Sequence, residues 1–430
     1  MAEIIKAPRG TFDVLPDDIP LWLRLEQAAR EAFRQYGYSE VRTPLLEQTR
    51  LFVRGIGETT DIVEKEMYTF TGKGRDESIS LRPEATAGIV RAYIEHNYHK
   101  KAPLQKFCYM GPMFRYERPQ AGRQRQFNQI GVEVLGTHAA EADVETIALA
   151  LDILRGFGLS GVRLKINSLG CRKCRPRYRK AVDAFVAGRV DSLCADCKRR
   201  YERNIFRVLD CKVESCRGLI AEIPEVDGHL CGECLAHFER VRSLLGELEI
   251  EYVKDKFLVR GFDYYTRTVY EMAHPALGAR DAVCGGGRYD NLVEDLGGPP
   301  TGAVGFSIGT EATILALRNA RSGEPPEGSK LQAGAVLVLV DESVSTAAFI
   351  LLSQLRSAGV AAEMPFDARS VKAQMRAVNA RRARVAVILG PDEVSAGSAR
   401  VKDMASGAEN AVASAEVTEA VKKILAAPES

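Results

Sequence analysis

Polar side chains alternate along one short segment, and their spacing suits the binding of a small polar ligand. If residues 125–135 form a strand, Gln129 and Glu133 lie on one face, on either side of Gly131, which has no side chain. The opposite face is largely apolar and is expected to meet the core. The polar face then lines either solvent, which is the commoner arrangement in sheets, or the floor of a pocket.

The preceding segment, FRYERPQAGRQR (114–125), is rich in arginine. Its pattern predicts two short strands around a loop, with Arg115 and Glu117 on the same side of their strand. Arginine suits the bidentate recognition of phosphate, although a solvated hairpin would also account for the charge. The sequence therefore predicts either an anion site or an exposed hairpin here.

Two later segments carry further polar and aromatic groups. LVRGFDYYTRTVYE (258–271) places an arginine, an aspartate and two tyrosines within six positions, which is enough to bound a small amphipathic ligand. The glycines of CGGGRYDNLVEDLGG (284–298) either let the backbone approach a phosphate closely or form a tight turn between strands. Neither segment is specific when taken alone.

Cysteines are concentrated between residues 169 and 249, where eight of them form four close pairs. The N-terminus lacks the apolar stretch of a signal peptide, so we expect a cytoplasmic protein. In a reducing compartment, such pairs are better explained as ligands of one or two structural zinc ions than as disulfides. Unliganded thiols and redox pairs are the alternatives. The predicted metal ligands are Cys171, Cys174, Cys194, Cys197, Cys211, Cys216, Cys231 and Cys234. Cys108 and Cys284 stand alone and are expected to be packing residues.

The elements that must position these residues follow an α+β pattern, with a mostly antiparallel sheet flanked by helices. The sheet is expected to resume near Phe257, after the cysteine-rich segment, through Val259, Tyr270, Val283 and Phe306. The earlier predicted strands are residues 104–110, 113–118, 126–135 and 162–167, and the predicted helices are residues 21–36, a helix after Pro83, and 142–157.

Changes in composition predict five parts of the chain. Strand and helix signals alternate in the last part (strands at 335–340, Val360 and 385–389, helices at 346–357 and 371–382), which predicts a small three-layer α/β domain. The parts are residues 1–168 as the first part of the core, 169–249 as a cysteine-rich insertion, 250–320 as the second part of the core, 321–334 as a linker, and 335–430 as the C-terminal domain.

Composition sets broad limits on function. The chain has 430 residues, of which 46% are hydrophobic and 27% charged, and this excludes bulk disorder. A net charge of +2 is too small to indicate a nucleic-acid partner by itself. Local clusters are more informative. Residues 171–217 contain 14 Lys and Arg against 6 Asp and Glu, and residues 372–384 have five basic and no acidic residues, which suits contact with an RNA backbone or a solvated helix face.

Together these segments resemble the histidyl-tRNA synthetases of the bacterial type, a family of class II aminoacyl-tRNA synthetases. The resemblance runs from PRGTFDVLPDD at residue 8 nearly to the C-terminus. Class II motif 1 looks like GYSEVRTPLLEQTRLF, with its proline at Pro44, and motif 2 looks like MFRYERPQAGRQRQFNQIGVEVLG. The two histidine-family signatures look like LVRGFDYYTRTVYE and AVCGGGRYDNLV. The probability that four such segments occur in this order by chance is very small.

This resemblance implies a cytoplasmic homodimer that uses ATP with Mg²⁺ to form histidyl-adenylate from L-histidine and then charges tRNA(His). It implies that the core is catalytic and that the C-terminal domain binds the anticodon. Arg115 and Arg260 are the implied catalytic cations at the α-phosphate and the histidine carboxylate. The implied histidine ligands are Glu84 and Thr86 at the amino group and Gln129, Glu133, Tyr264 and Tyr265 around the imidazole, and the implied contacts to the tRNA acceptor end are Arg118, Gln120 and Arg123.

The chain departs from the family pattern at Ala312, in the segment GFSIGTEAT, where the family usually has an arginine that stacks on adenine. Arg318 lies more than one helical turn further on and is a poor substitute. The departure leaves an alternative open, a catalytically weakened paralogue that binds histidine as a regulatory subunit, similar to that of ATP phosphoribosyltransferase. A tRNA-binding sensor without aminoacylation is a third possibility.

Overall fold

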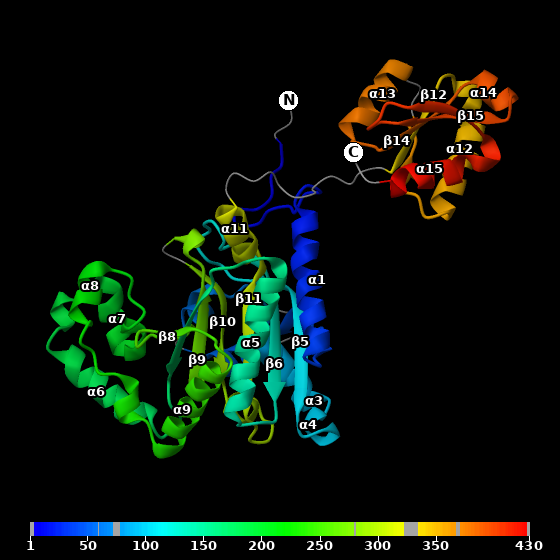
Figure 1. Ribbon diagram of the computed structural model, residues 1–430. Coiled ribbons are helices and arrows are strands. Elements are labelled where there is room, and N and C mark those ends of the chain that lie inside the picture. The colour runs from blue at the N-terminus through cyan, green and yellow to red at the C-terminus, as the bar shows by residue number, and fades with distance from the viewer. Residues whose placement is uncertain are drawn as a thin grey trace. The chain divides into compact units, whose positions relative to one another are not determined.

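The structure is a computed structural model that describes residues 4–58, 60–71, 78–278, 281–321, 334–366 and 370–427. Its internal contacts divide the chain into two units, one holding nearly all residues before 322 and the other those from 334 onward (Figure 1). The predicted linker, residues 321–334, falls almost entirely outside the described residues. The other predicted domain boundaries stay predictions.

Within the described residues, the first unit is built on an eight-stranded sheet with the order β1-β5-β6-β11-β10-β9-β7-β8. The two outer pairs, β1 with β5 and β7 with β8, are parallel, and the inner pairs are antiparallel. This confirms the α+β class with a mostly antiparallel sheet. The strands are β1 (Ser39–Glu40), β5 (Gln105–Phe114), β6 (Gln126–Leu135), β11 (Ala303–Gly309), β10 (Ala282–Arg288), β9 (Thr266–Ala273), β7 (Arg163–Ser168) and β8 (Tyr252–Lys254).

One face of this sheet carries the main hydrophobic core. Ile130, Val132 and Val134 of β6 point into it at every second position, as their alternation predicts. Their neighbours Gln129 and Glu133 therefore lie on the other face. The helices that cover the core face (Figure 1) are α1 (Ile19–Gln35), α5 (Ala140–Phe157), α9 (Gly232–Glu247) and α11 (Thr310–Ala320).

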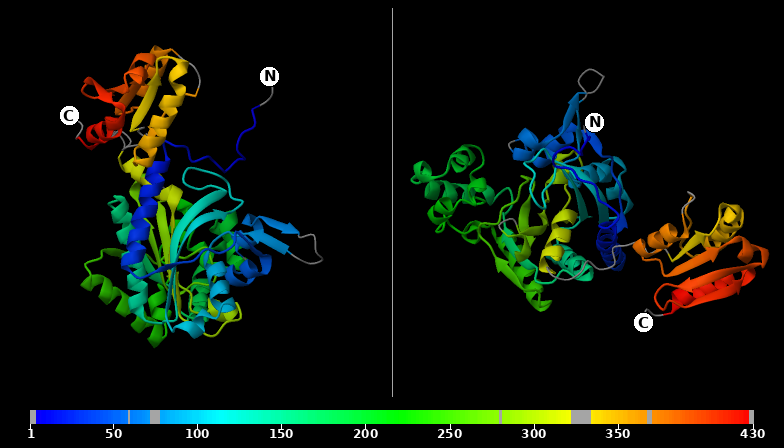
Figure 2. Two further views of the ribbon diagram at one scale, coloured as in Figure 1. Left: turned by 90° about the vertical axis from the view of Figure 1, so that its right-hand side faces the viewer. Right: turned by 90° about the horizontal axis from the view of Figure 1, so that it is seen from above.

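The second face of the sheet has a separate core. It packs against α3 (Thr86–Glu95), α10 (Leu292–Asp295) and residues of the loop before β9. Phe107 and Tyr109 of β5 lie in this core. Next to it, the small sheet β2-β4-β3 extends from the unit (Figure 2). The remaining elements here are β2 (Leu46–Gln48), α2 (Thr49–Ile56), β3 (Thr69–Thr71), β4 (Ser78–Leu81) and α4 (Tyr98–Lys101).

Two strand predictions in this unit are wrong. Residues 104–110 and 113–118 are not separate strands, because β5 continues through Pro112 and ends at Phe114. Proline is tolerated there because the short β1 pairs with β5 only near Phe107, so no ladder donor is lost on that edge. Val259 is also not in a strand, since it lies in the loop before β9.

The segment between β7 and β8 forms a helical insertion with its own core (Figure 1). Five of the cysteines are buried in that core and three are partly buried. Tyr178 stacks on Phe206 with ring centroids 5.5 Å apart, which packs two of its helical segments together. The elements are α6 (Arg175–Ala187), α7 (Ala195–Arg203), the short 3₁₀ helix η3 (Ile205–Val208), α8 (Glu214–Leu219) and α9.

The second unit contains a five-stranded sheet in the order β13-β12-β14-β15-β16. Two helices, α12 and α15, pack on one face and α13 packs on the other, which confirms the three layers. The antiparallel pair β15 and β16 was not predicted, and β13 begins two residues after Val360. The elements are β12 (Ala335–Leu339), α12 (Ser345–Ser357), β13 (Ala362–Glu363), α13 (Val371–Ala380), β14 (Val385–Leu389), α14 (Pro391–Ser395), β15 (Ser398–Asp403), β16 (Glu409–Ala413) and α15 (Val417–Ala426). In the described part of the chain, no helix is long and apolar enough to span a bilayer.

A buried ion pair ties the sheet to its covering helices. Arg288 at the end of β10 is fully buried and pairs with Asp143 of α5. Its guanidinium also donates to the carbonyls of Thr137 and Ala139, at 2.8 Å each. His237 of α9 lies 3.3 Å from the same carboxylate. Burial acts to raise the pKa of Asp143, but Arg288 and His237 hold it below its ordinary value.

Replacing Asp143 by alanine should lower the free energy of unfolding by about 3 to 5 kcal/mol, because Arg288 would remain as an uncompensated buried charge. Chemical denaturation followed by circular dichroism measures the change. Glu31→Ala removes an exposed pair with Arg34 and should leave the transition in place. An unchanged midpoint for Asp143→Ala would contradict this argument.

Candidate active site

Glycines on three neighbouring strands open a space on the second face of the sheet. Gly131 of β6, Gly305 of β11 and Gly285 of β10 are positions where a Cβ atom would collide with a side chain. A Cβ atom at Gly305 would meet the carboxylate of Glu133, and one at Gly285 would meet the guanidinium of Arg260. The triple glycine is thus neither a phosphate loop nor a turn. It lies in strand β10, and its first glycine makes room for the guanidinium of Arg260.

Glu133 lies in this space and is 1% exposed. Its Oε1 accepts a hydrogen bond from the Thr86 hydroxyl at 2.6 Å, and its Oε2 accepts one from the Tyr289 phenol. Burial raises the pKa of Glu133 to about 8, although both donors act to lower it. A carboxyl group in this state favours a ligand that brings an N–H or a cation, because such a donor restores the carboxylate form. Exposure of this strand face to solvent is excluded.

Glu84 lies at the start of α3, close to Glu133. Its Oε2 accepts from the backbone N–H of Thr86 at 2.6 Å, and its Oε1 accepts from that of Ala87 at 2.9 Å. These bonds satisfy two of the free N–H groups at the helix start. Burial raises the pKa of Glu84, and the charge of Glu84 acts to raise that of Glu133. A cationic group near both carboxyls would therefore be stabilised by each of them.

Gln129 lies on the same face of β6 as Glu133. Its Nε2 donates to the hydroxyl of Ser307 on β11 at 3.1 Å. Its Oε1 is buried, and no partner for it is found among the described residues. Because an unpaired buried acceptor costs about 1 to 3 kcal/mol, this oxygen is a site for an N–H donor from a ligand.

The loop before β9 brings a cation and two aromatic rings to the same space. The rings of Tyr264 and Tyr265 lie 4.7 Å apart, and Tyr264 makes an edge contact with Tyr289 at 5.6 Å. Arg260 Nη1 donates to Glu271 Oε2 at 3.1 Å. Its Nε is buried without a partner within the described ranges. This donor can serve an acceptor on a ligand.

Arg115 follows β5 and is not in a strand, which corrects the prediction that it shares a strand face with Glu117. Its Nε donates to the carbonyl of Pro83 at 2.8 Å, and its guanidinium lies 5.1 Å from the ring centroid of Phe127. Burial lowers its pKa, and the charge of Arg260 acts in the same direction. Two cations close enough to disfavour each other make a place for an anion.

The remaining predicted contacts to tRNA lie in the loop between β5 and β6. Arg118 and Gln120 are exposed, and Gln120 pairs with Arg123 through two backbone hydrogen bonds of 3.0 Å. The side chain of Arg123 forms an ion pair with Glu117. The loop also passes close to the start of α11, since a Cβ atom at Gly122 would lie 3.9 Å from that of Ala312.

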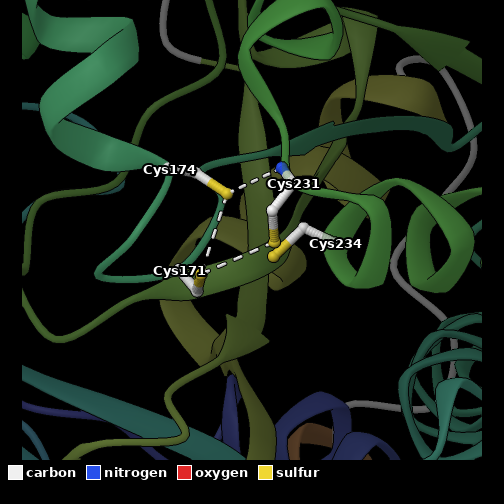
Figure 3. Close-up of side chains that lie close together, drawn as sticks. All are labelled: Cys171, Cys174, Cys231 and Cys234. Carbon is white, nitrogen blue, oxygen red and sulfur yellow. Dashed lines mark hydrogen bonds between the residues drawn. The ribbon is translucent and has the colours of Figure 1, made fainter.

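The four cysteine pairs of the insertion come together as two sets of four. Within each set, the sulfur atoms all lie within 4.8 Å of one another, and all ten cysteines of the chain are free. Each set could hold a metal ion. Cys108 and Cys284 are buried in strands, as expected of packing residues. The first set is Cys171, Cys174, Cys231 and Cys234 (Figure 3), and the second set is Cys194, Cys197, Cys211 and Cys216.

The basic stretch 372–384 forms a helical face only in part. The helix α13 ends at Ala380, earlier than predicted. Lys372 and Arg376 are exposed on it. Beyond the helix, Arg381 and Arg384 form ion pairs with acidic residues of the same unit. Among the described residues of this stretch, the exposed cations outside these ion pairs are Lys372, Arg376 and Arg382.

Sequence reasoning missed three neighbours of the polar cluster. Tyr289 stands in the signature AVCGGGRYDNLV, which was the available signal for it. Ser307 bonds Gln129. The phenol of Tyr109 lies where a side chain at Gly131 would be. The last two become neighbours of β6 only through strand pairing, so no local signal could have identified them.

The site as a whole combines acceptors, aromatic rings and cations. Glu133 and the Gln129 oxygen offer acceptors on the sheet, the tyrosines form a wall, and Arg115 and Arg260 provide positive charge. This arrangement can hold a small molecule that carries an N–H donor at one end and an anionic group at the other. It brings together the residues predicted to bind histidine.

Two family models match the chain. The model described as histidyl-tRNA synthetase matches residues 10–313, and the anticodon binding domain matches residues 334–424. A relative from Natranaerobius thermophilus, named Histidine–tRNA ligase, is 46% identical over 98% of this chain and 99% of its own.

Solved structures agree with these matches. Apo histidyl-tRNA synthetase from S. aureus has a TM-score of 0.79 at 34% identity and covers 97% of this chain and 100% of its own. A Bacillus halodurans structure described as an ATP phosphoribosyltransferase regulatory subunit/histidyl-tRNA synthetase has a TM-score of 0.64, covering 91% of this chain and 99% of its own. At 22% identity it shares the fold alone. The family models and the relatives, over nearly the full length of the chain, place this protein in the histidyl-tRNA synthetase family.

Proposed function

We propose that the protein is a histidine–tRNA ligase, which converts L-histidine and ATP to histidyl-adenylate and transfers histidine to tRNA(His). The observation that carries the proposal is the pair of buried acceptors, Glu133 and the Gln129 oxygen, in a chain of this family. A neutral imidazole has one N–H donor and one bare nitrogen. The buried acceptors suit the N–H, and the phenols of the tyrosine wall suit the bare nitrogen.

The substrate would lie across the second face of the sheet. Its ammonium group is placed near Thr86 and Glu84, where two buried carboxyls favour a cation. Its imidazole is placed among Gln129, Glu133, Tyr264 and Tyr265. A ligand of the same size without the ring nitrogens would leave these acceptors unpaired, so the pocket would discriminate against it.

Arg115 and Arg260 act at the reacting phosphate. A carboxylate oxygen of histidine attacks the α-phosphorus of ATP, and the bond to pyrophosphate breaks, with its electron pair leaving on pyrophosphate. Negative charge grows on the α-phosphate oxygens during this step. Two partly buried cations already in position stabilise it without reorganisation. ATP enters with Mg²⁺, as the family uses it.

Transfer to tRNA follows at the loop between β5 and β6. A ribose hydroxyl at the 3′ end of tRNA attacks the carbonyl carbon of the adenylate, and AMP leaves. The exposed Arg118 and Gln120, with Arg123, are proposed to contact this acceptor end. The second unit binds the anticodon stem, and Lys372 and Arg376 supply contacts to its phosphates.

We also propose that the two cysteine sets hold structural zinc. Charging of tRNA takes place in the cytoplasm, where thiols stay reduced, so four thiolates at one point are better explained by zinc than by disulfides. The chemistry of the donors fits, because zinc is bound by four sulfur ligands in many structural sites. When bound, such an ion supplies cross-links between chain segments and takes no part in the reaction.

The protein should be a homodimer, since motif 1 around Pro44 is used at the subunit interface of class II enzymes. Exposed apolar residues next to it, among them Leu46 and Phe70 at 51% exposure, are consistent with a covered surface. Light scattering should give twice the chain mass of 47.2 kDa. Leu46→Lys should shift the mass toward the monomer, while Ile350→Lys on α12 should not. A monomeric parent protein at micromolar concentration would refute the proposal.

Glu133→Gln should weaken histidine binding by about 10- to 100-fold. The glutamine amide would place an N–H donor opposite the N–H donor of the imidazole, so the hydrogen bond between them would be lost. ATP binding should stay within about twofold. Isothermal titration calorimetry separates the two ligands. Glu141→Gln, on the surface at the start of α5, is the matched control. Equal losses for histidine and ATP in Glu133→Gln would point to general disruption of the strand instead.

Ala312→Arg should strengthen ATP binding, by up to about thirtyfold if the new cation stacks on adenine with about 2 kcal/mol. Ala312→Met matches its length without the charge and is the control. ATP–pyrophosphate exchange with histidine gives the readout. If the parent shows no exchange and Ala312→Arg does, the regulatory alternative is favoured for the natural chain. An unchanged ATP dependence would show that this position does not reach the nucleotide.

A further inference from the structure

The cysteine sets differ in what they connect. The first set joins the end of β7 to the start of α9, the two points where the insertion leaves the core and returns to it. The second set lies within the insertion and joins the start of α7 to the residues on either side of the α8 start. The two sets therefore fix different segments.

Three sulfur–sulfur separations within the sets match those of a tetrahedral metal site. Sulfur atoms around a zinc ion with bonds of about 2.3 Å lie about 3.8 Å apart. The Sγ atom of Cys171 lies 3.7 Å from that of Cys174 and 4.0 Å from that of Cys231. The Sγ atoms of Cys194 and Cys211 lie 3.9 Å apart. The backbone N–H of Cys231 donates to the Cys174 sulfur at 3.1 Å, an outer hydrogen bond of the kind that orients metal ligands.

Each fixed segment also holds the loop before β9. Arg175, directly after Cys174, donates from Nη1 to the carbonyl of Asp263 at 3.1 Å. Asn204, between Cys197 and Cys211, donates from Nδ2 to Asp263 Oδ1 at 3.1 Å. Arg207, from the same segment as Asn204, donates to the carbonyl of Gly261. All three contacts reach the residues between Arg260 and Tyr264, which carry the proposed chemistry.

Asp263 is held from the opposite side as well. Its N–H donates to the carbonyl of Ile56 at the end of α2, at 3.0 Å. A cavity of about 370 Å³ lies at this junction and is lined by Arg175, Asn204 and Asp263, among others. Tyr264 and Tyr265 of this loop pack in the second core. At Asp263 and Gly261, directional hydrogen bonds from the insertion add to that packing.

We propose that the insertion is a zinc-dependent brace for the histidine loop. Two zinc ions, one in each cysteine set, fix the segments that carry Arg175, Asn204 and Arg207, and these residues hold Asp263 and Gly261 so that Arg260 and Tyr264 face the substrate. Asp263 and Asn204 are positioning residues, which act through the loop. The inference rests on the proposed function for its substrate.

The experiment uses the full-length protein purified with zinc. Elemental analysis should give two zinc ions per chain. The double variant Cys197→Ser with Cys211→Ser should keep one zinc and lose about tenfold in histidine affinity by calorimetry. Cys108→Ala, a buried cysteine outside both sets, should keep two ions and the parent affinity.

Asn204→Ala keeps the test decisive if the cysteine variant does not fold. It should retain two zinc ions and the parent melting temperature but lose about tenfold in histidine affinity, since the bond it removes ends on a carboxylate. Asn204→Asp places a second carboxylate against Asp263 and should lose more. Tyr201→Phe on α7 removes a bond to Asp183 inside the insertion and should leave histidine affinity unchanged.

Full histidine affinity in Asn204→Ala, or in the cysteine variant with one zinc, would overturn the brace. Parent protein that contains no zinc and has eight freely titrating insertion thiols would overturn the metal sites. Parent protein with two zinc ions but no histidine binding would refute the proposed function instead. The two failures are therefore distinguishable.

Discussion

Removing an unpaired carboxylate from water costs several kcal/mol, and Glu133 is 1% exposed. Its surroundings follow from that cost. Thr86 at the start of α3 and Tyr289 after β10 each donate to it, and both lie far from it in the sequence. Even with these donors, burial raises the pKa of Glu133 to about 8. The two donors therefore do not fully offset the burial, and an imidazole N–H can supply a further hydrogen bond. Selectivity for the proposed substrate and the cost of burial have the same origin.

The sheet provides this burial without giving up its core. Alternate residues of β6 face opposite sides, so Ile130 and Val132 pack against helices while Glu133 faces the site. On the site face, glycines leave space for polar side chains, whereas large apolar side chains fill the core face. Gly305 leaves space for the carboxylate and Gly285 for Arg260, because a Cβ atom at either would overlap them. The charges can therefore lie directly on the sheet, where the backbone is most rigid.

Two networks of side-chain contacts hold this sheet and its loop in place. Arg288 and Asp143 bind β10 to α5, one residue before Tyr289 supplies its phenol to Glu133. On the other side, Asn204 of the insertion reaches Asp263, three residues after Arg260. Both contacts lie next to groups that are proposed to face the substrate, and neither contact is proposed to touch the substrate itself. Small changes in either network would be expected to appear as losses in affinity.

Alternation along β6 was enough, by sequence alone, to place Gln129 and Glu133 on one face, because the strand period is local. The four family segments determined the family, and the spacing of the cysteines indicated metal ligands.

Sequence could not decide whether the polar face met solvent, since that depends on α3 and the loop before β9 covering it. Nor could it decide which cysteine pairs combine. The first pair meets the fourth and the second meets the third, because the insertion returns to the core at α9. The triple glycine was interpreted as either a phosphate-binding loop or a turn, and only pairing with β9 and β11 made it a strand. Local periodicity can be determined from the sequence, whereas the partners of Glu133 and of the cysteines come together only when distant segments pack.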